Sequence, residues 1–326
     1  MFRSRFSLAS VLLASTYLVL APHAFAQDFP QGKPITIVVG FVAGGGTDTA
    51  SRIIAKQVSE NLGQPVVVEN RSGAGGTIAT QFVANAKPDG ATLLLGTIGP
   101  MAVAPHMMKL GYEPLTDFAP ITMGVNFPNV LVVSPSLNIN TFEQFIAMAK
   151  ADPGKLTYAS TGVGSAAHLA GELLNQRAGV EIVHVPYKGG SAAMVDLLGG
   201  RLSAYYSTPS SAEAHIKSGK VIAIATTGLS RSAILPDVPT VAEMGYPGFN
   251  ASNWYAFVAP AKTPVAVLDR WNTELVKAIN TPEVTAALDK HGLVPEPTSR
   301  QQLDDFIHSE SKTWERVVKE RGIKME

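Results

Sequence analysis

Glycine-rich turns that lead from an apolar run into a helical stretch recur along this chain. The first lies within VVGFVAGGGTDTASRIIAKQVSENLG, residues 38–63, where an apolar run enters three consecutive glycines and a helical pattern then continues to Gly63. Three similar turns lie in the segments NRSGAGGT, ASTGVGSAAH and PYKGGSAA. Turns of this kind join the strands and helices of parallel sheets that carry helices on both faces. The turns therefore predict an α/β fold.

The alternation of apolar runs with helical stretches occurs twice along the chain. In the first unit, strands are expected at residues 35–40, 65–70 and 91–97, with helices between them. A second series of helices and strands follows, from about residue 126 to about residue 227. Two units suit this chain, because its 326 residues exceed the usual size of a single domain.

The last third of the chain is expected to return to the first unit. It holds an apolar strand, WYAFVAP, and helices that begin at Pro264, Pro282 and Ser299. The chain would then cross between two lobes near residues 121–133 and again near residues 221–228. We predict two doubly wound lobes joined by a two-strand hinge, which is the architecture of a ligand-binding clamp. The first lobe would comprise residues 27–125 and 228–326, and the second lobe would comprise residues 126–227.

The N-terminus has the three parts of a secretory signal peptide. Arg3 and Arg5 precede a mostly apolar run from Leu8 to Leu20, and an A-x-A pattern ends at Ala26. A transmembrane helix needs roughly 20 predominantly apolar residues, whereas this run is shorter and contains serine and threonine. We predict cleavage after Ala26, with residues 1–26 as the signal peptide. The mature chain is therefore expected to be exported and not embedded in a membrane.

Charge and cysteine content exclude several classes of protein. The chain has 26 basic and 26 acidic residues, and loss of Arg3 and Arg5 leaves the mature form with a formal charge of about −2. This balance gives no electrostatic footprint for nucleic acid or anionic lipid. The absence of cysteine excludes disulfides, thiolate metal sites and thiol catalysis. The histidines of the mature chain are scattered without the spacing of a metal site, so no metal is expected.

The glycine-rich turns are also the expected binding site. In an open parallel sheet, ligands bind beyond the carboxyl ends of the strands, where these turns lie. Glycine allows close approach to the backbone, and the following helix adds unpaired N–H groups and the positive end of its dipole. We expect Thr47 or Asp48 to cap the first helix, and Ser165 to cap the helix that begins near Ala166. The turns therefore predict a site for a carboxylate or a phosphate.

Five other side chains near the turns have more than one interpretation. Asp48 would repel an anion, so we expect a structural cap or a contact with an amine of the ligand. Lys188 suits either an anion contact or an exposed position, and His168 is expected to be a structural partner and not a base. Tyr205 and Tyr206 end a strand at the cleft, and alternation along the strand should point only one of them at the ligand.

The motifs of several enzyme classes are incomplete here. TGVGSA, residues 161–166, imitates a dinucleotide-binding turn, but the next strand ends in HVPY without the acidic residue that ribose binding needs. GAGGT lacks the lysine of a phosphate-binding loop, and the chain contains neither G-x-S-x-G nor H-E-x-x-H. We therefore expect no catalytic residues and no cofactor.

These segments, in this order and at this spacing, resemble the solute receptors of the tripartite tricarboxylate transporters, also called the Bug family. The resemblance covers essentially the whole mature chain and rests on AGGGTDTASRIIAKQVSENLGQPVVVENRSGAGGTIA, PDGATLLLGT, GKLTYASTGVGSAAHLAGELL, HVPYKGGSAAMVDLLGG and ILPDVPTVAEMG. It implies a periplasmic binding protein of type 2, with a Venus-flytrap fold and no catalysis. Such a receptor is expected to act as a monomer that delivers a small carboxylate to a two-component membrane permease.

The resemblance also implies which residues bind the ligand. In this family the carboxylates of the ligand meet the first glycine-rich turn and a loop of the second lobe, often through bridging waters. The corresponding residues of this chain are Phe41, Gly44, Gly45, Gly46 and Thr47 in the first turn, Thr97 after the third strand, Thr161, Gly162, Gly164 and Ser165 in the second-lobe loop, and Ser207 and Thr208 on the far side of the cleft.

The chain departs from the family pattern near the first turn. Gly40, Val42 and Ala43 stand where the family commonly has prolines, which makes the turn less rigid and its wall more apolar. Tyr205 and Tyr206 replace residues that are often smaller or more polar. We hypothesise a ligand with an aromatic or longer apolar body between polar ends, such as an aromatic dicarboxylate, with an aliphatic dicarboxylate as the alternative. An exported carboxylate-acting enzyme and a chemosensory receptor on the same scaffold are the alternative functions.

Overall fold

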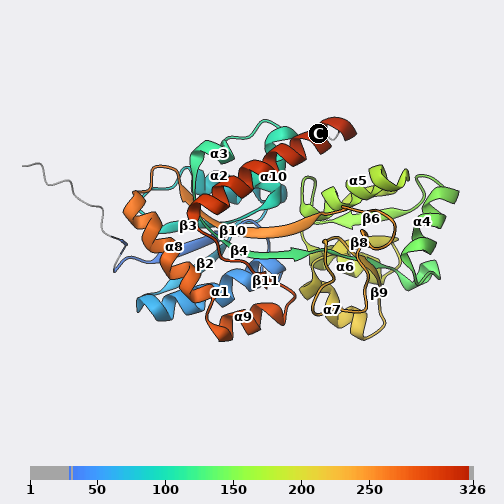
Figure 1. The fold of residues 1–326 in the computed structure, drawn as a ribbon, viewed down its shortest axis with the longest axis horizontal. Helices are drawn as coiled ribbons and strands as arrows, with labels where there is room; N and C mark the ends of the chain where they lie inside the picture. The colour runs from blue at the N-terminus through green and yellow to red at the C-terminus, as the bar shows by residue number, and fades with distance from the viewer. Residues whose placement is uncertain (1–28, 31, 323–326) are drawn as a thin grey trace, which may run out of the picture.

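The structure, a computed structural model, describes residues 29–30 and 32–322 and consists of two α/β lobes (Figure 1). Each lobe is built on its own β-sheet, with six strands in the first lobe and five in the second. The expected α/β class and two-lobed architecture are confirmed. The predicted signal peptide, residues 1–26, lies outside the described residues.

The sheet of the first lobe has the strand order β11-β4-β10-β3-β1-β2. Strands β1, β2 and β3 are parallel, as the βα pattern predicts, and β10 is antiparallel to both β3 and β4. The strands are β1 (Ile35–Val39), β2 (Val66–Asn70), β3 (Thr92–Thr97), β4 (Phe118–Pro128), β10 (Ser252–Pro260) and β11 (Val294–Pro295).

Helices cover both faces of the first sheet, and the side chains of β1 alternate between them. Ile37 packs in the core beneath α1 and α8, whereas Val38 packs in the core beneath α2 and α10. Trp271 of α8 is fully buried, and its Nε1 donates a hydrogen bond to Gly90 O at 2.9 Å. Burial of such a side chain stabilises the fold by roughly 2–3 kcal/mol. The helices are α1 (Gly46–Leu62), α2 (Thr77–Ala84), α3 (Pro114–Asp117), α8 (Val265–Ile279), α9 (Pro282–Asp289) and α10 (Arg300–Arg321), with short turns at Ala74–Gly76, Gly99–Val103 and Ala104–His106.

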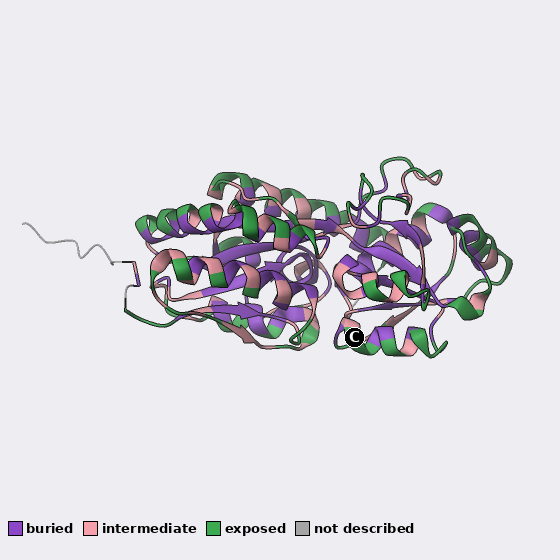
Figure 2. Cartoon of the chain, turned by 90° about the horizontal axis from the view of Figure 1, so that it is seen from below, coloured by how far each residue is buried: buried purple, intermediate pink, exposed green. Residues whose placement is uncertain are grey.

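The sheet of the second lobe has the order β7-β6-β8-β5-β9 and is also covered on both faces. Tyr206 packs with α4 and α5, and its neighbour Tyr205 packs with α6 and α7. Figure 2 shows buried residues along the strands and on the inner faces of the helices in both lobes. The elements are β5 (Val130–Val133), β6 (Thr157–Ser160), β7 (Val183–Pro186), β8 (Ala204–Ser207), β9 (Ile222–Thr226), α4 (Phe142–Ala151), α5 (Ala166–Ala178), α6 (Gly190–Leu198), α7 (Pro209–Lys217) and a short turn at Pro135–Leu137.

The chain passes between the lobes at two neighbouring points. Asn129 joins β4 of the first sheet to β5 of the second, within the range 121–133 that the sequence predicts. The return occurs at Ser252, where β10 begins and enters the first sheet beside β4. Helices α8, α9 and α10 then pack on the first lobe. The end of α10 also reaches the second lobe, where Gln176 Nε2 of α5 donates to Glu320 Oε2 at 3.1 Å.

The return is later than the expected crossing at residues 221–228. Strand β9 pairs with β5 in the second sheet, and Leu235 of the segment that follows packs in the core of the second lobe. Tyr246 packs edge-on against Phe142, with ring centroids 5.9 Å apart, and Arg177 donates a hydrogen bond to Pro247 O at 2.6 Å. We therefore propose that the second lobe extends to about residue 250 instead of residue 227, because the proline- and glycine-rich segment finds its packing partners there.

Candidate ligand-binding site

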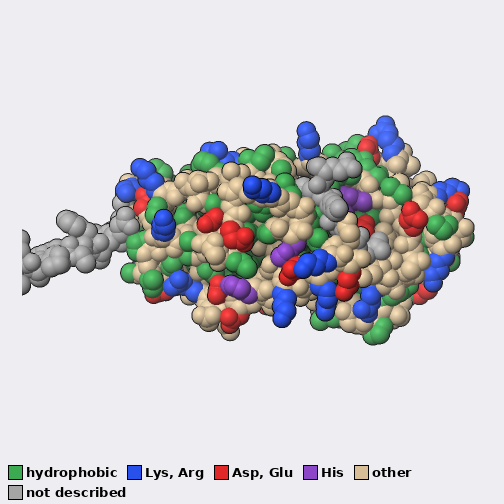
Figure 3. All heavy atoms as spheres, turned by 90° about the horizontal axis from the view of Figure 1, so that it is seen from above, with side chains coloured by type: hydrophobic (Ala, Val, Ile, Leu, Met, Phe, Trp, Pro, Cys, Tyr) green, Lys and Arg blue, Asp and Glu red, His purple; other side chains and the backbone are tan. Residues whose placement is uncertain are grey.

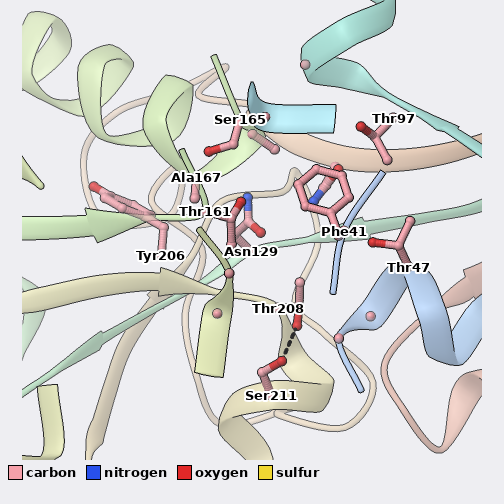
Figure 4. Close-up of a pocket in the computed structure, with 18 of the residues that line it drawn as sticks. Phe41, Thr47, Thr97, Asn129, Thr161, Ser165, Ala167, Tyr206, Thr208 and Ser211 are labelled. Carbon is pink, nitrogen blue, oxygen red and sulfur yellow. Dashed lines mark hydrogen bonds between the residues drawn. The ribbon is translucent and has the colours of Figure 1, made fainter. Parts of the chain in front are cut away.

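A cavity lies between the two lobes, next to the ends of β1, β3, β6 and β8 (Figure 4). The volume of this cavity is about 70 Å³. One water needs about 10–15 Å³ by the same measure, so the cavity has room for several waters or a small ligand. The predicted residues that line it are Phe41, Gly45, Gly46, Thr47, Thr97, Thr161, Ser165 and Thr208.

The first glycine-rich turn brings the N-terminus of α1 to the cavity. Gly45 precedes the helix, and Gly45, Gly46 and Thr47 all lie in the cavity wall. The first N–H groups of a helix have no partner within it, so this end offers backbone donors and the positive end of the helix dipole. The expected cap by Thr47 or Asp48 is wrong, because both residues lie inside the first turn of α1. The residue at the cap position is Gly45, and no side chain caps the helix there.

Asp48 holds the turn in place from behind. Its Oδ2 accepts a hydrogen bond from Gly44 N–H at 3.0 Å, and its carboxylate also binds the Arg52 side chain and Asn70 Nδ2. Burial disfavours the ionised carboxylate, but the hydrogen bonds from Arg52, Gly44 and Asn70 outweigh burial and lower the pKa of Asp48 below its ordinary value. Gly44 has a φ of +83°, which favours glycine. Gly44 and Asp48 therefore shape the turn, and neither lines the cavity.

The loop before α5 supplies the second lobe's side of the cavity. The Ser165 side chain accepts a hydrogen bond from His168 N–H, so Ser165 caps α5 as predicted. Ser160 Oγ binds both the N–H and the carbonyl of Gly162, each at 3.0 Å. Gly164 N–H donates to His168 Nδ1 at 3.1 Å. These bonds fix the loop so that Thr161 and Ser165 face the cavity.

Four predicted residues do not line the cavity. Gly44 and Gly164 direct their N–H groups to Asp48 and His168 instead. Gly162 lines a neighbouring cavity, and Ser207 is fully buried with its hydroxyl donating to Thr208 O at 3.1 Å. We therefore interpret these four residues as positions that set the shape of the loops.

Several residues of the cavity wall were not predicted. They come from the β7–α6 turn, from α7 and from the strands that connect the lobes: Gly189, Gly190, Ser191, Ser211, Asn129, Asn253 and Tyr255. The glycine-rich segment PYKGGSAA signals the first three. Ser211 lies three residues after Thr208, and Thr208 Oγ1 donates a hydrogen bond to Ser211 Oγ at 2.9 Å. The sequence carries no comparable signal for Asn129, Asn253 or Tyr255.

Tyr205 and Tyr206 both border the cavity, although their side chains lie on opposite faces of β8. Tyr206 packs edge-on against Tyr158, with ring centroids 5.6 Å apart. Tyr205 lies close to Gly190, which has no side chain to displace it. Alternation therefore holds for the packing of the two rings, and the expectation that only one of them points at the ligand stays a prediction.

The cavity wall is electrically neutral. None of the described residues that line it carries a charged side chain. Burial raises the pKa of Tyr205 to about 12, and burial also raises the pKa of Tyr255, so both hydroxyls stay protonated at neutral pH. Lys188 lies in the neighbouring cavity beside Gly162, at an exposed position. Figure 3 shows acidic and basic side chains interspersed over the drawn face of the molecule, without a patch of one sign.

Glycines let the two lobes meet around the cavity. A Cβ atom on Gly99 of the first lobe would lie 2.9 Å from Gly164 O of the second lobe. A Cβ atom on Gly75 would lie 3.2 Å from Val163 O, and one on Gly189 would lie 2.9 Å from the Val42 side chain. The two lobes are therefore in direct contact, at distances that leave no space for side chains at Gly99 and Gly189.

Two of the histidines lie together behind the second-lobe loop. The rings of His168 and His184 stack with centroids 4.0 Å apart, and His184 Nε2 lies 2.6 Å from Ser160 Oγ. Burial lowers the pKa of His168 to about 4 and that of His184 to about 3. Both are therefore neutral at pH 7 and support the loop, as predicted for His168. Within residues 29–30 and 32–322, no group of three or more His, Asp and Glu side chains could hold a metal ion.

Comparisons with known proteins agree with this arrangement. Residues 50–323 match the family model described as "Tripartite tricarboxylate transporter family receptor". The chain is 39% identical over 308 residues to protein BugT of Bordetella pertussis, which covers 94% of each chain. It superposes on Rpa4515 of R. palustris, solved with adipate, with a TM-score of 0.86 and 34% identity over 91% of this chain and 99% of the other. MatC of Rhodopseudomonas palustris, with bound malate, gives a TM-score of 0.83 and 31% identity over 88% of this chain and 99% of the other.

Proposed function

This chain belongs to the tripartite tricarboxylate transporter family of receptors, and from that premise we propose that it is a periplasmic receptor for a small carboxylate. The ligand would occupy the cavity between the lobes, and the closed complex would deliver it to a two-component membrane permease. The protein would act as a monomer and would bind without turnover.

The neutral cavity wall is the observation that carries this proposal. Thr47, Thr97, Thr161, Ser165 and Thr208 bring hydroxyl groups to it from both lobes, next to the N-termini of α1 and α5. Hydroxyls and helix N-terminal N–H groups stabilise an anion through fixed dipoles. A carboxylate that touches donors on both lobes would bind the closed form more tightly than the open form and so shift the population toward it.

The ligand is proposed to be a dicarboxylate. Adipate and malate are bound by two similar proteins, Rpa4515 and MatC. Phe41, Val42, Tyr205 and Tyr255 give this cavity an apolar and aromatic wall between its polar ends. This wall supports an aromatic or longer aliphatic body, and a short aliphatic dicarboxylate is the alternative.

A binding screen tests the proposal. The mature chain from Gln27 would be freed of copurified ligand by partial unfolding and then heated with aliphatic dicarboxylates, tricarboxylates, amino acids and aromatic carboxylates. A ligand that binds only the folded state raises the Tm by mass action. Strong shifts with dicarboxylates, one ligand bound per chain and an unchanged ligand spectrum afterwards are expected. A shift only with amino acids, or chemical conversion of the ligand, would contradict the proposal.

Export and delivery need separate measurements. None of the helices in the described part of the chain is long and apolar enough to cross a membrane. We expect the mass of the protein purified from the periplasm to correspond to a chain that begins at Gln27.

We also expect small-angle scattering to show a smaller radius of gyration with ligand than without it. If the scattering profiles with and without a tightly bound ligand were identical, a permease would have no closed form to recognise, and this part of the proposal would fail.

A further inference from the structure

Two asparagines at the hinge face the cavity with unused hydrogen-bonding groups. Asn129 lies where the chain first passes between the lobes, and the residue is only 1% exposed. Its Nδ2 is buried and has no hydrogen-bond partner among the described residues. Asn253 lies on β10, where the chain returns, and its buried Oδ1 also has no partner among the described residues. Both residues line the cavity.

The pairing of the strands brings these two residues to the same end of the first sheet. Asn253 lies opposite Phe127 in the antiparallel pair of β10 and β4, and Asn129 follows Phe127 by two residues. Asn129 comes directly after Pro128, the last residue of β4 that pairs with β10, so the two asparagines lie at the same end of this strand pair, and both line the cavity. Tyr255, two residues after Asn253, faces the cavity as well. Figure 4 shows Asn129 among the side chains that line the cavity, together with Phe41 and Thr161.

The backbone of Asn129 is fully engaged, which leaves the side chain as its free group. Asn129 N–H donates to Thr227 Oγ1 at 2.9 Å, and Asn129 O accepts from Thr227 N–H at 2.9 Å. A buried amide that lacks a partner destabilises the folded state, so such groups in a binding cavity point to a ligand or to ordered water.

We propose that Asn129 and Asn253 recognise a hydroxyl group on the body of the ligand, so that the receptor selects hydroxycarboxylates over the corresponding unsubstituted acids. A hydroxyl group can accept a hydrogen bond from Asn129 Nδ2 and donate one to Asn253 Oδ1 at the same time. A methylene group can do neither, and it would leave both amides buried without partners. This inference rests on the proposed carboxylate receptor and adds the position that discriminates between ligands.

Matched pairs of acids test the inference by titration calorimetry. The pairs are malate and succinate, 3-hydroxyadipate and adipate, and mandelate and phenylacetate. In the pair whose length fits the cavity, the hydroxy acid is expected to bind about tenfold more tightly, which corresponds to one satisfied group in place of an unpaired one. In Asn129→Leu and Asn253→Leu this preference is expected to fall to about twofold or less.

Asn61→Leu is the matched control, because Asn61 Nδ2 is also buried without a partner among the described residues but lies on α1, outside the cavity wall. This variant should keep the preference. The hinge variants should melt at or above the wild-type Tm, since each loses an unpaired polar atom, and this shows that they fold.

Equal affinity for both members of every pair would overturn the inference and leave the carboxylate receptor intact, because ordered water would then satisfy the two amides. A preference that survives in both hinge variants would overturn it as well. If no acid of any pair binds the wild-type protein, the receptor proposal itself fails, and the proposal for the two asparagines fails with it.

Discussion

Thr227 Oγ1 accepts a hydrogen bond from Asn129 N–H, and Thr227 N–H donates one to Asn129 O, each at 2.9 Å. The Thr227 hydroxyl also donates to Ala251 O at 2.9 Å, and Thr227 O accepts from Ala251 N–H at 2.9 Å. All three residues are buried. A single threonine therefore connects the two segments through which the chain passes between the lobes.

Thr227→Val should lower the free energy of unfolding by about 1–3 kcal/mol, because it leaves Asn129 N–H buried without its acceptor. Chemical denaturation of the mature protein measures this. The control is Thr226→Val, since Thr226 Oγ1 is buried without a partner in the described part of the chain. That variant should be at least as stable as the wild type, and equal losses at both positions would contradict the role given to Thr227.

Gly99→Ala should weaken ligand binding without destabilising the free protein. The new Cβ atom would lie 2.9 Å from Gly164 O on the opposite lobe, a contact that exists only when the lobes meet. We expect a loss of about tenfold in affinity by calorimetry and a larger radius of gyration with ligand present. Gly199→Ala, with the nearest atom at 3.4 Å and no place in the cavity wall, should bind like the wild type.

Asp48→Asn should loosen the first glycine-rich turn. An amide nitrogen would face the donors on Gly44, Arg52 and Asn70, so the free energy of unfolding should fall by about 1–3 kcal/mol. The ion pair itself contributes little of this, because Arg52 is half exposed. Ligand affinity should fall too, since Gly45 and Gly46 lose their fixed position. Glu60→Gln, which breaks a surface pair with Lys56, should change neither quantity.

Acid should destabilise the protein through His168 and His184. Their pKa values of about 4 and about 3 lie below the ordinary 6.5, so the unfolded chain takes up protons at a higher pH than the folded chain does. The free energy of unfolding should therefore fall as the pH drops from about 6.5 toward about 3. The negative charge of Glu172 near His184 opposes part of this effect.

Denaturation curves at several pH values between 7 and 4 measure the slope that these histidines produce. His184→Gln removes one titrating group and should flatten the slope. His308→Gln, at an exposed position on α10, should leave it unchanged. A slope that is the same in all three proteins would show that the stacked pair does not govern acid stability.

The sequence predicts those parts of the site that a short motif marks. Glycines followed by threonine or serine mark the helix N-termini at Gly46 and Ala166, and these ends do reach the cavity. Asn129 and Asn253 could not be found in this way, because only the pairing of distant strands brings them together. The end that we propose for the second lobe has no local signal either. Its last segment contains prolines and glycines typical of a surface loop, and the contacts of Tyr246 with Phe142 and of Pro247 with Arg177 support its place in that lobe.

The cavity wall without charged side chains has a consequence for the surroundings in which the receptor can work. Salt weakens the attraction between separated charges, but it has little effect on short hydrogen bonds from buried dipoles. Because the donors around this cavity are hydroxyl, amide and backbone groups, ionic strength has little to screen once the lobes have closed. The affinity of the closed form for its ligand should therefore change little between low and high ionic strength.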